Sequence, residues 1–117
     1  MYEYNAVVVR VIDADTVDVS VDLGFDVHIK QRVRLVGINA HEKHTNLGKE
    51  ASAYVRKIIP LGTKIVLQSS KDNNDKYGRY LARIILPETN ECLNDILIKR
   101  GHAVEYWGKG KKEDFLP

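Results

Sequence analysis

The chain contains a single cysteine, Cys92, and no long hydrophobic run. One cysteine cannot form a disulfide within the chain or supply the ligands of a cysteine-based zinc site. The four histidines are scattered, without the His-Glu-x-x-His spacing of a paired zinc site. No apolar run approaches the roughly 20 residues that span a membrane, and residues 1–5 do not begin a signal peptide. We therefore expect a cytoplasmic protein with no membrane partner.

A large excess of positive charge is also absent. The chain has 18 lysines and arginines against 16 aspartates and glutamates, a formal net charge of +2. Neutralisation of duplex DNA by overall charge is therefore not expected to be the main mode of binding. Basic residues do gather at residues 30–34, 71–79 and 109–112, so a local basic face remains open. We expect a monomer in which residues 1–107 form one domain and residues 108–117 form a basic, flexible tail.

Hydrophobic periodicity predicts three strands followed by a helix. A nearly continuous apolar run at residues 7–12 predicts a strand that is buried on much of both faces. Alternation at residues 17–23 and 27–35 predicts two half-buried antiparallel strands, with Arg34 on the polar face of the second. Helical spacing over residues 47–59, before Pro60-Leu61-Gly62, predicts the helix.

The rest of the sequence predicts two more strands, at residues 64–68 and 79–86, joined by a polar loop. Asn90 or Asn94 is expected to cap a short helix that ends at Gly101. This order predicts a mainly β, α+β fold. It is a five-stranded OB-type Greek-key barrel with a helix between its third and fourth strands and a short C-terminal helix. Barrels of this type bind oligonucleotides on their open face.

Acidic and amide side chains near two turns suggest a site for a hard cation. Asp13 and Asp15 lie in one predicted turn, and Asn39 follows the strand that carries Arg34. Ca²⁺ prefers several oxygen ligands, which Asp15, the amide oxygen of Asn39, a backbone carbonyl and waters could supply. Asp13 and Thr16 would support these ligands without binding the metal. Taken alone, each aspartate is more simply explained by turn chemistry.

Three other side chains could act on a phosphodiester. Glu42 is a carboxylate outside the proposed ligand pair and could activate a water as general base. Arg34 and Arg79 could each place a guanidinium on phosphate oxygens, where charge grows in the transition state. Considered separately, Glu42 suits a helix start, and either arginine could be an ordinary solvated side chain. Their shared placement at strand ends of one small barrel favours phosphodiester hydrolysis.

Four ordered motifs resemble those of the staphylococcal nuclease-like (thermonuclease) family, which the chain matches over roughly residues 7–107. They read Val-Ile-Asp-Ala-Asp-Thr-Val, Val-Arg-Leu-Val-Gly-Ile-Asn-Ala-His-Glu, Gly-Lys-Glu-Ala-Ser and Asp-Lys-Tyr-Gly-Arg, at residues 11–17, 33–42, 48–52 and 75–79. The resemblance implies an OB-type barrel that cleaves DNA and RNA phosphodiesters with calcium. It implies that Asp15 binds the metal and that Glu42 is the general base. It also implies that Arg34 and Arg79 bind phosphate.

Four further side chains are candidate nucleic-acid contacts. The resemblance implies that Lys76 and Tyr77 contact the terminus of a nucleotide. Tyr106 or Trp107 could stack on a base, although a place in the core explains either aromatic equally well. The expected partner is nucleic acid, single-stranded DNA or RNA above all.

The chain departs from the family pattern at two positions near the expected site. Asn39 stands where the family usually has a metal-binding aspartate, so the site has one negative charge fewer. His41 stands where the loop usually has proline, which leaves the approach to Glu42 less restricted. The first departure concerns metal binding and the second concerns the placement of the general base.

Two functions of different classes fit these residues. The first is a metal-dependent nuclease, since an amide oxygen still binds calcium, although less tightly than a carboxylate does. The second is a catalytically weakened or inactive module that binds single-stranded nucleic acid or a protein partner. Glu42 favours the enzyme because a pure binding module has no evident use for it. A structural or inhibitor protein is least favoured, because it leaves both arginines unexplained.

Overall fold

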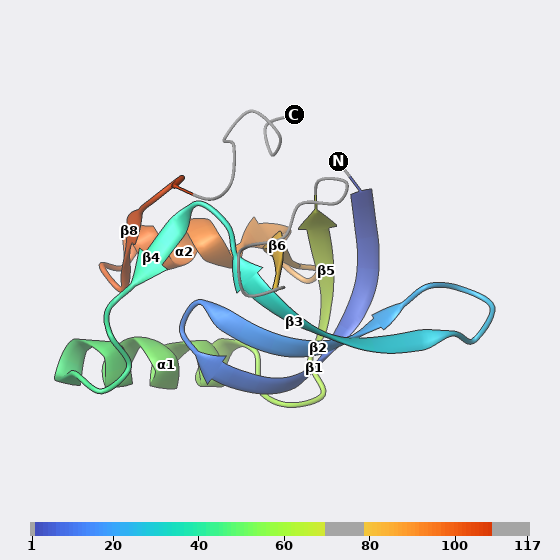
Figure 1. Cartoon of the computed structure of the whole chain (residues 1–117), viewed down its shortest axis with the longest axis horizontal. Coiled ribbons are helices and arrows are strands. Elements are labelled where there is room, and N and C mark those ends of the chain that lie inside the picture. Colours follow the sequence, from blue (N-terminus) through green and yellow to red (C-terminus); the bar gives the residue numbers. More distant parts are fainter. Residues whose placement is uncertain (1, 70–78, 109–117) are drawn as a thin grey trace.

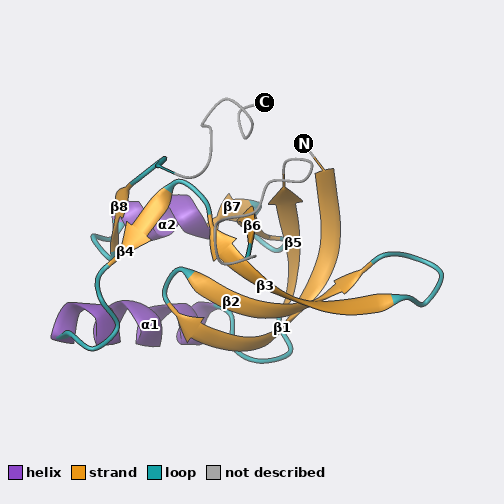
Figure 2. Ribbon diagram, viewed as in Figure 1, coloured by secondary structure: helices purple, strands orange, loops and turns teal. Residues whose placement is uncertain are grey.

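The computed structural model describes residues 2–69 and 79–108. Within this part of the chain, strands form a barrel and two helices pack beside it (Figures 1 and 2). The elements are β1 (Tyr2–Asp13), β2 (Thr16–Asp22), β3 (His28–Leu35), β4 (Ile38–Ala40), α1 (Asn46–Ile58), β5 (Lys64–Ser69), β6 (Tyr80–Leu86), β7 (Glu91–Cys92), α2 (Leu93–Lys99) and β8 (Ala103–Glu105). Neither helix is long and apolar enough to cross a membrane.

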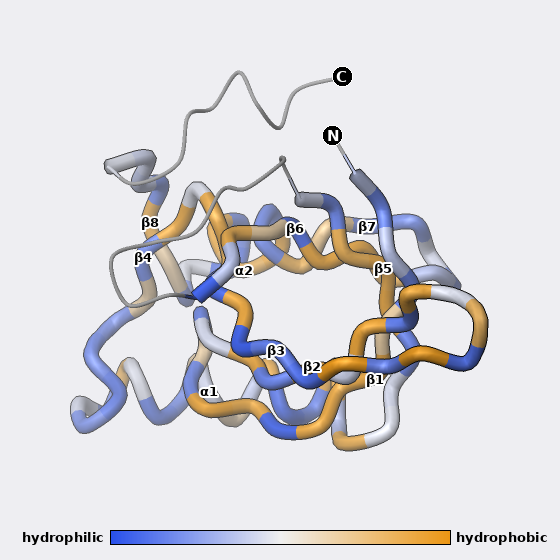
Figure 3. The backbone as a smooth tube through the Cα atoms, turned by 45° about the vertical axis from the view of Figure 1, so that its right-hand side comes forward, coloured by the Kyte–Doolittle hydropathy of each residue, from blue (hydrophilic) through white to orange (hydrophobic). Residues whose placement is uncertain are grey.

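Five strands close into a barrel in the order β3-β2-β1-β5-β6. Neighbouring strands are antiparallel except β3 and β6, whose parallel pairing closes the barrel. Around this ring of strands, hydrophobic stretches are interrupted by hydrophilic residues (Figure 3). The predicted OB-type α+β fold is therefore confirmed. The short strands β4, β7 and β8 are additions, because two or three residues carry too little alternation to be recognised in the sequence.

The interior of the barrel is filled from alternate positions of the strands. On β2 every second residue from Val17 to Val21 is buried, as the alternation predicts. On β3 the buried residues are Val33 and Leu35, whereas Ile29 is exposed. The outer half of the β2–β3 hairpin projects beyond the barrel, so its inward-facing positions meet little of the core (Figure 1). A two-residue period alone does not reveal how far a hairpin extends past its neighbours.

The prediction that residues 7–12 form a strand buried on much of both faces is wrong for β1. Val8 is 1% exposed but its neighbour Val7 is 37% exposed, so one face of this strand meets the core. Its pairing with β2 shifts register between Val8 and Arg10 and again between Val11 and Asp13. Such bulges bend a strand and change which side chains point inward. The apolar run is buried on one side because α1 covers the outside of β1 only in part.

Helix α1 begins and ends within one residue of its predicted bounds. Thr45 is its N-cap and accepts a hydrogen bond from the Gly48 N–H at 3.1 Å. Ala51, Val55 and Ile59 follow at a spacing of four residues and are fully buried. This apolar stripe packs α1 against the barrel and places the N-terminus of the helix beside the segment that follows β4.

Helix α2 ends as predicted but begins differently. It stops at Lys99, and Gly101 adopts a positive φ of 76°, the backbone conformation expected after a helix end. Its N-cap is Cys92, which makes no side-chain capping bond, so the prediction of Asn90 or Asn94 as the cap is wrong. Asn94 lies inside the first turn and is 2% exposed. Nothing in the local sequence indicates that this amide is buried.

The buried amide of Asn94 joins α2 to the barrel. Its Oδ1 accepts a hydrogen bond from the Ile84 N–H at 3.1 Å. Its Nδ2 donates to the Val36 carbonyl at 2.9 Å and to the Ala82 carbonyl at 3.2 Å. These contacts fix α2 on β6 and on the residue that follows β3, where the site described next begins.

Candidate active site

The turn between β1 and β2 holds two aspartates beside each other. The Asp15 N–H donates to Asp13 Oδ1 at 3.2 Å, and the Thr16 hydroxyl donates to Asp15 Oδ1 at 3.2 Å. Ala14 between them is 1% exposed and anchors the turn in the core. The bulge before Asp13 sets how β1 enters the turn. Both carboxylates are therefore placed by a fixed backbone.

Asp15 connects this turn to β3 and β4. Its backbone carbonyl accepts from the Leu35 N–H at 2.9 Å, and its Oδ2 accepts from the Ala40 N–H at 3.1 Å. The same Oδ2 lies 3.6 Å from Nη2 of Arg34, in an ion pair whose side chains are only 13% and 14% exposed. A charge pair so little exposed is weakly screened by water. Asp15 is the residue on which the strand ends converge.

The Arg34 guanidinium bridges the two proposed metal ligands. Its Nη1 donates to the Leu35 carbonyl at 2.7 Å, and its Nη2 donates to Asn39 Oδ1 at 3.3 Å. Gly37, with φ of 80°, turns the chain between β3 and β4 so that Asn39 comes back over Arg34. One face of the guanidinium is thus held by protein oxygens, which fixes its position before any ligand binds.

The two neighbouring carboxylates have opposite pKa shifts. Burial raises the pKa of Asp13 to about 6, and the hydrogen bond and negative charge of Asp15 act in the same direction. Burial alone would also raise the pKa of Asp15. A hydrogen bond with Asp13, the charge of Arg34 and the Ala40 N–H together outweigh burial and lower that pKa. Asp15 is therefore ionised at neutral pH and suited to hold positive charge.

Arg79 reaches the same network from the start of β6. Its Nη1 donates to the Thr16 hydroxyl at 3.3 Å, and that hydroxyl itself donates to Asp15. A hollow of about 280 Å³ opens beside it on the outside of the barrel, lined by Ile12, Asp13, Thr16, Arg32 and Arg79. Two of these lining residues are arginines, but Arg32 pairs with Asp18 at 2.8 Å and Asp13 is itself acidic, so the positive charge of the hollow is largely balanced.

Glu42 lies close in sequence to this network but is not bonded into it. It follows the Ala40 amide by two residues, and its side chain is exposed. Within the described residues its carboxylate makes no hydrogen bond or ion pair. The predicted residues therefore divide in two. One connected group contains Asp13, Asp15, Thr16, Arg34, Asn39 and Arg79, and Glu42 stands apart on the loop before α1.

Two residues without a predicted role hold the Glu42 backbone. The Thr45 hydroxyl donates to the Glu42 carbonyl at 2.7 Å, and the Thr45 N–H donates to the same oxygen at 3.0 Å. Gly48 packs so tightly that a Cβ added there would lie 1.8 Å from that oxygen. A threonine directly before a predicted helix is an N-cap signal in the sequence. The sequence gives no indication that Gly48 packs closely against the Glu42 carbonyl.

Of the four predicted nucleic-acid contacts, the structure describes Tyr106 and Trp107, and these two differ in their surroundings. Strand β8 pairs with β4, and the N–H of Tyr106 donates to the Gly37 carbonyl at 2.8 Å, so the backbone of this exposed tyrosine lies beside the turn between β3 and β4. The Trp107 ring covers Gly37, where an added Cβ would lie 2.4 Å from it, and its Nε1 donates to Glu105 at 2.9 Å. The fold thus uses Trp107 for packing. Lys76, Tyr77 and most of the predicted tail and polar loop lie outside the described residues.

A comparison with protein families bears on this arrangement. The family model described as staphylococcal nuclease homologue matches residues 32–116, which is most of the chain. The chain belongs to the staphylococcal nuclease family. The match includes Arg34, Asn39, Glu42 and Arg79, while the Asp13–Thr16 turn precedes it. The geometry above joins that turn to the matched part through Asp15.

Curated relatives of this staphylococcal nuclease family member include named nucleases. "Endonuclease YhcR" of Bacillus subtilis is 32% identical over 97% of this chain, and "Thermonuclease" of Staphylococcus hyicus is 34% identical over 82% of it. "Protein ParB" of Escherichia coli is 34% identical over 96% of this chain. The chain spans 10%, 56% and 63% of these proteins, respectively. It therefore covers less than two thirds of each relative's own length.

The donor atoms of the site fit a hard cation in type. Ionised Asp15 and the amide oxygen of Asn39 are the oxygen ligands that Ca²⁺ prefers. Among residues 2–69 and 79–108, no group of three or more His, Cys, Asp or Glu side chains could hold a metal ion. Most of the six to eight oxygens that Ca²⁺ takes would then come from water, backbone carbonyls and a bound phosphate.

Proposed function

We propose that this chain is a metal-dependent nuclease that hydrolyses phosphodiester bonds of DNA or RNA, acting as a monomer on single strands. The observation that carries the proposal is the convergence of Asp15, Arg34 and Asn39 at one point, with Arg79 joined through Thr16. Oxygens that suit a cation and guanidinium groups that suit a phosphate lie within one network. Membership of the staphylococcal nuclease family supports the same reaction class.

Arg34 and Arg79 bind the scissile phosphate in this proposal. Arg34 is oriented by the Leu35 carbonyl and by Asn39, so its position costs no reorganisation during the reaction. Arg79 lines the hollow beside Asp13 and would reach a phosphate from the opposite strand end. Charge that develops on the phosphate oxygens is neutralised by both guanidinium groups.

Glu42 is the general base. Its carboxylate is exposed and has no protein partner within the described residues, so it is free to accept a proton from an attacking water. The cap at Thr45 and the contact with Gly48 hold its backbone. Calcium bound through Asp15 and Asn39 would supply Lewis acid chemistry, polarising the phosphate and the water. Asp13 and Thr16 keep Asp15 oriented and ionised.

One observation favours the alternative of a weakened or inactive binding module. Arg34 donates to Asn39 and pairs with Asp15, so protein groups already occupy the oxygens that a metal would use. With an amide in place of a second carboxylate, the site attracts a cation less strongly. A module of this kind would retain affinity for single-stranded nucleic acid through both arginines while it cleaves slowly or not at all.

The deciding experiment measures cleavage of end-labelled single-stranded DNA and RNA in calcium and in chelator. We expect cleavage with calcium and none with chelator. Glu42→Gln should lower turnover by roughly 10²–10⁴-fold, the usual contribution of a general base. Glu50→Gln, at an exposed carboxylate on α1, is the matched control and should leave turnover unchanged. Tight binding by the wild-type protein without metal-dependent cleavage would instead establish the binding module.

A further inference from the structure

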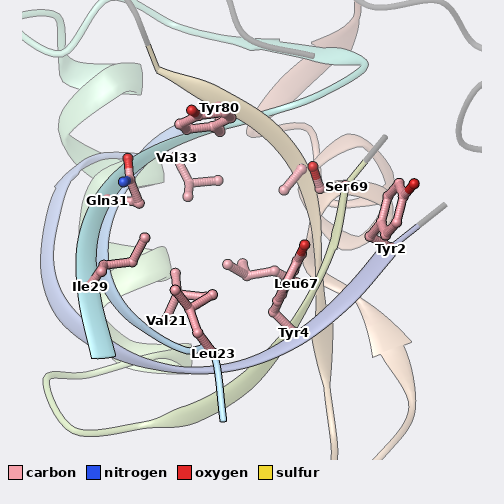
Figure 4. A pocket seen from close by; sticks show the side chains of 11 residues that line it. Tyr2, Tyr4, Val21, Leu23, Ile29, Gln31, Val33, Leu67, Ser69 and Tyr80 are labelled. Carbon is pink, nitrogen blue, oxygen red and sulfur yellow. The ribbon is translucent and has the colours of Figure 1, made fainter. Parts of the chain in front are cut away.

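Alternate side chains of β3 face two different surfaces. Ile29 and Val33 point into a cavity of about 400 Å³ at the end of the barrel, which Tyr80 also lines (Figure 4). Successive residues of a strand point to opposite faces, so the residues that alternate with them face the outside of the barrel. These outward-facing residues are Lys30, Arg32 and Arg34. The wall of the barrel therefore separates the cavity from Arg34, and it is the outer surface that continues from the candidate site.

The strands β1, β2 and β3 pair so that their outward-facing side chains form rows across the sheet. The first row lies at the candidate site, where Thr16 pairs with Arg34. In the second row Asp18 pairs with Arg10 on one side and with Arg32 on the other. The rows are about 6.6 Å apart, because a strand rises roughly 3.3 Å per residue. The hollow of the candidate site is lined by both Thr16 and Arg32, so the first two rows share one surface.

A third row lies one step farther from the candidate site. Ser20 pairs with Lys30 on β3 and with Val7 on β1, and Val7 pairs in turn with Lys64 on β5. Both lysines and Val7 are exposed, and Ser20 is half-buried. The outer surface that begins at the candidate site thus extends without a change of face to a row with a lysine at each end.

Positive charge exceeds negative charge in the second and third rows. Arg32 donates to both oxygens of Asp18, at 2.8 and 3.1 Å, so these two charges balance each other. Three cations in these rows form no ion pair with a described residue: Arg10, Lys30 and Lys64. A hydrogen bond from Arg32, and the charges of Arg32, Arg10 and Lys30, lower the pKa of Asp18 although burial opposes them. Arg10 and Lys30 therefore lie close to one carboxylate that is already neutralised, and their charge is available to an anion.

The positive surface ends before the tip of the hairpin. The fourth row pairs Asp22 with His28, and Asp22 also accepts a hydrogen bond from the Gly24 N–H at 2.8 Å. A carboxylate fixed at this point repels a phosphate. The tip beyond it presents the fully exposed side chain of Phe25. Two rows beyond the candidate site therefore suit a polyanion, and the fourth does not.

We propose that the outer face of β1, β2 and β3 carries the substrate strand away from the candidate site, with Arg10 and Lys30 each binding one phosphate. Surfaces of positive charge follow the backbone of single-stranded nucleic acid in many proteins. The inference rests on the proposed nuclease function, since it begins from a phosphate at Arg34 and Arg79. All four cations then lie on one face of the barrel, and each row beyond the candidate site holds one further phosphate.

The test compares a ligand that reaches only the candidate site with one that reaches all three rows. Thymidylyl thymidine carries a single phosphate and would be titrated by NMR, and octathymidylate would be measured by fluorescence anisotropy. All proteins carry Glu42→Gln and the buffer contains chelator, so that no cleavage occurs. Arg10→Gln and Lys30→Gln should each reduce the slope of log affinity against log salt by about 0.7 for octathymidylate, the value for one phosphate contact on a single strand. Neither should change the binding of thymidylyl thymidine.

Four further variants serve as controls. Arg34→Gln should weaken both ligands, because both place a phosphate at the candidate site. Arg10→Lys and Lys30→Arg keep the charge and should keep the salt slope of the parent protein. Lys99→Gln removes an exposed lysine from α2, which packs on β6 away from the outer face, and should change neither ligand. Thermal unfolding would confirm that each variant is folded.

An unchanged salt slope for octathymidylate in both Arg10→Gln and Lys30→Gln would overturn the proposed path. Equal losses for the two ligands would overturn it as well, because a contact beyond the candidate site cannot act on a single phosphate. Calcium-dependent cleavage by the wild-type chain tests the nuclease separately. Cleavage with an unchanged slope removes only the path, and a reduced slope without cleavage leaves the path on a binding module.

Discussion

The contact between Asn39 and Arg34 joins the polar groups of the candidate site. The amide oxygen of Asn39 accepts a hydrogen bond from a guanidinium that also pairs with Asp15. An amide is neutral, so it orients Arg34 without neutralising its charge. Asp15 is then the ionised group that balances the guanidinium and would bind a cation. In the proposed nuclease, an amide in place of a carboxylate at this position would therefore weaken metal binding more than phosphate binding.

Asn39→Asp should therefore bind calcium more tightly and turn over faster. A second carboxylate oxygen beside Asp15 adds attraction worth about tenfold in the dissociation constant, or roughly 1.4 kcal/mol. Isothermal titration with calcium and single-turnover cleavage would measure the two effects. Asn5→Asp adds the same charge on the exposed part of β1 and should change neither. Equal calcium affinity of Asn39→Asp and wild type would place Asn39 away from the metal.

At the scale of the element, the N-terminus of α1 controls where Glu42 lies. Thr45 caps the helix and also donates to the Glu42 carbonyl, so one side chain joins helix start and loop. Gly48 completes this junction because any larger residue would collide with Glu42. The loop that carries Glu42 is thereby positioned by a helix cap.

Thr45→Ala should affect both stability and turnover. Loss of the cap costs about 1 kcal/mol and lowers Tm by roughly 3–6 °C in a domain of this size. Turnover should fall by more than the loss of folded protein alone would cause, because the backbone of Glu42 loses a hydrogen bond. Calorimetry and cleavage kinetics at a temperature well below Tm measure the two effects.

Two variants separate these effects of Thr45. Thr45→Ser keeps the hydroxyl and should restore both stability and turnover. Thr63→Ala removes a comparable hydroxyl, which donates to the Pro60 carbonyl at 2.6 Å, from a turn outside the site and should alter stability alone. Wild-type turnover in Thr45→Ala would show that the cap does not position Glu42.

At the scale of the whole molecule, a buried amide connects the barrel to α2 and to the site. Asn94 bonds to Val36, Ala82 and Ile84, which belong to two different parts of the barrel wall. Val36 precedes the Gly37 turn that brings Asn39 over Arg34. Packing of α2 therefore supports the β3–β4 connection, together with the Trp107 ring on Gly37.

Asn94→Ala should be among the most destabilising single substitutions in the chain. It leaves buried backbone groups without partners, each costing about 1–3 kcal/mol, so a total near 3 kcal/mol is expected. Urea unfolding followed by circular dichroism measures this loss. Asn5→Ala, an exposed position on β1, is the same substitution and should stay within about 0.5 kcal/mol of wild type. A comparably small effect at Asn94 would mean that water replaces the lost bonds.

Much of the fold follows from local patterns, and the exceptions have physical causes. The predicted alternation is confirmed from Val17 to Val21 but not at Leu23, which is exposed, and the helical stripe from Ala51 to Ile59 is confirmed, because each requires one buried face. The prediction for residues 7–12 is wrong since the second face of β1 depends on what packs outside it. The prediction of Asn94 as the helix cap is wrong because the side chain instead bonds to backbone groups that lie far away in the sequence.

The sequence by itself determined the barrel, the first helix and the set of polar residues at the strand ends, since hydrophobic period and motif spacing are local properties. Only the tertiary structure decided that Arg34 contacts both Asp15 and Asn39, because these residues meet through chain closure. The cavity beneath Tyr80 is likewise tertiary. It exists because side chains of five strands leave space at the end of the barrel, and no single strand records that volume.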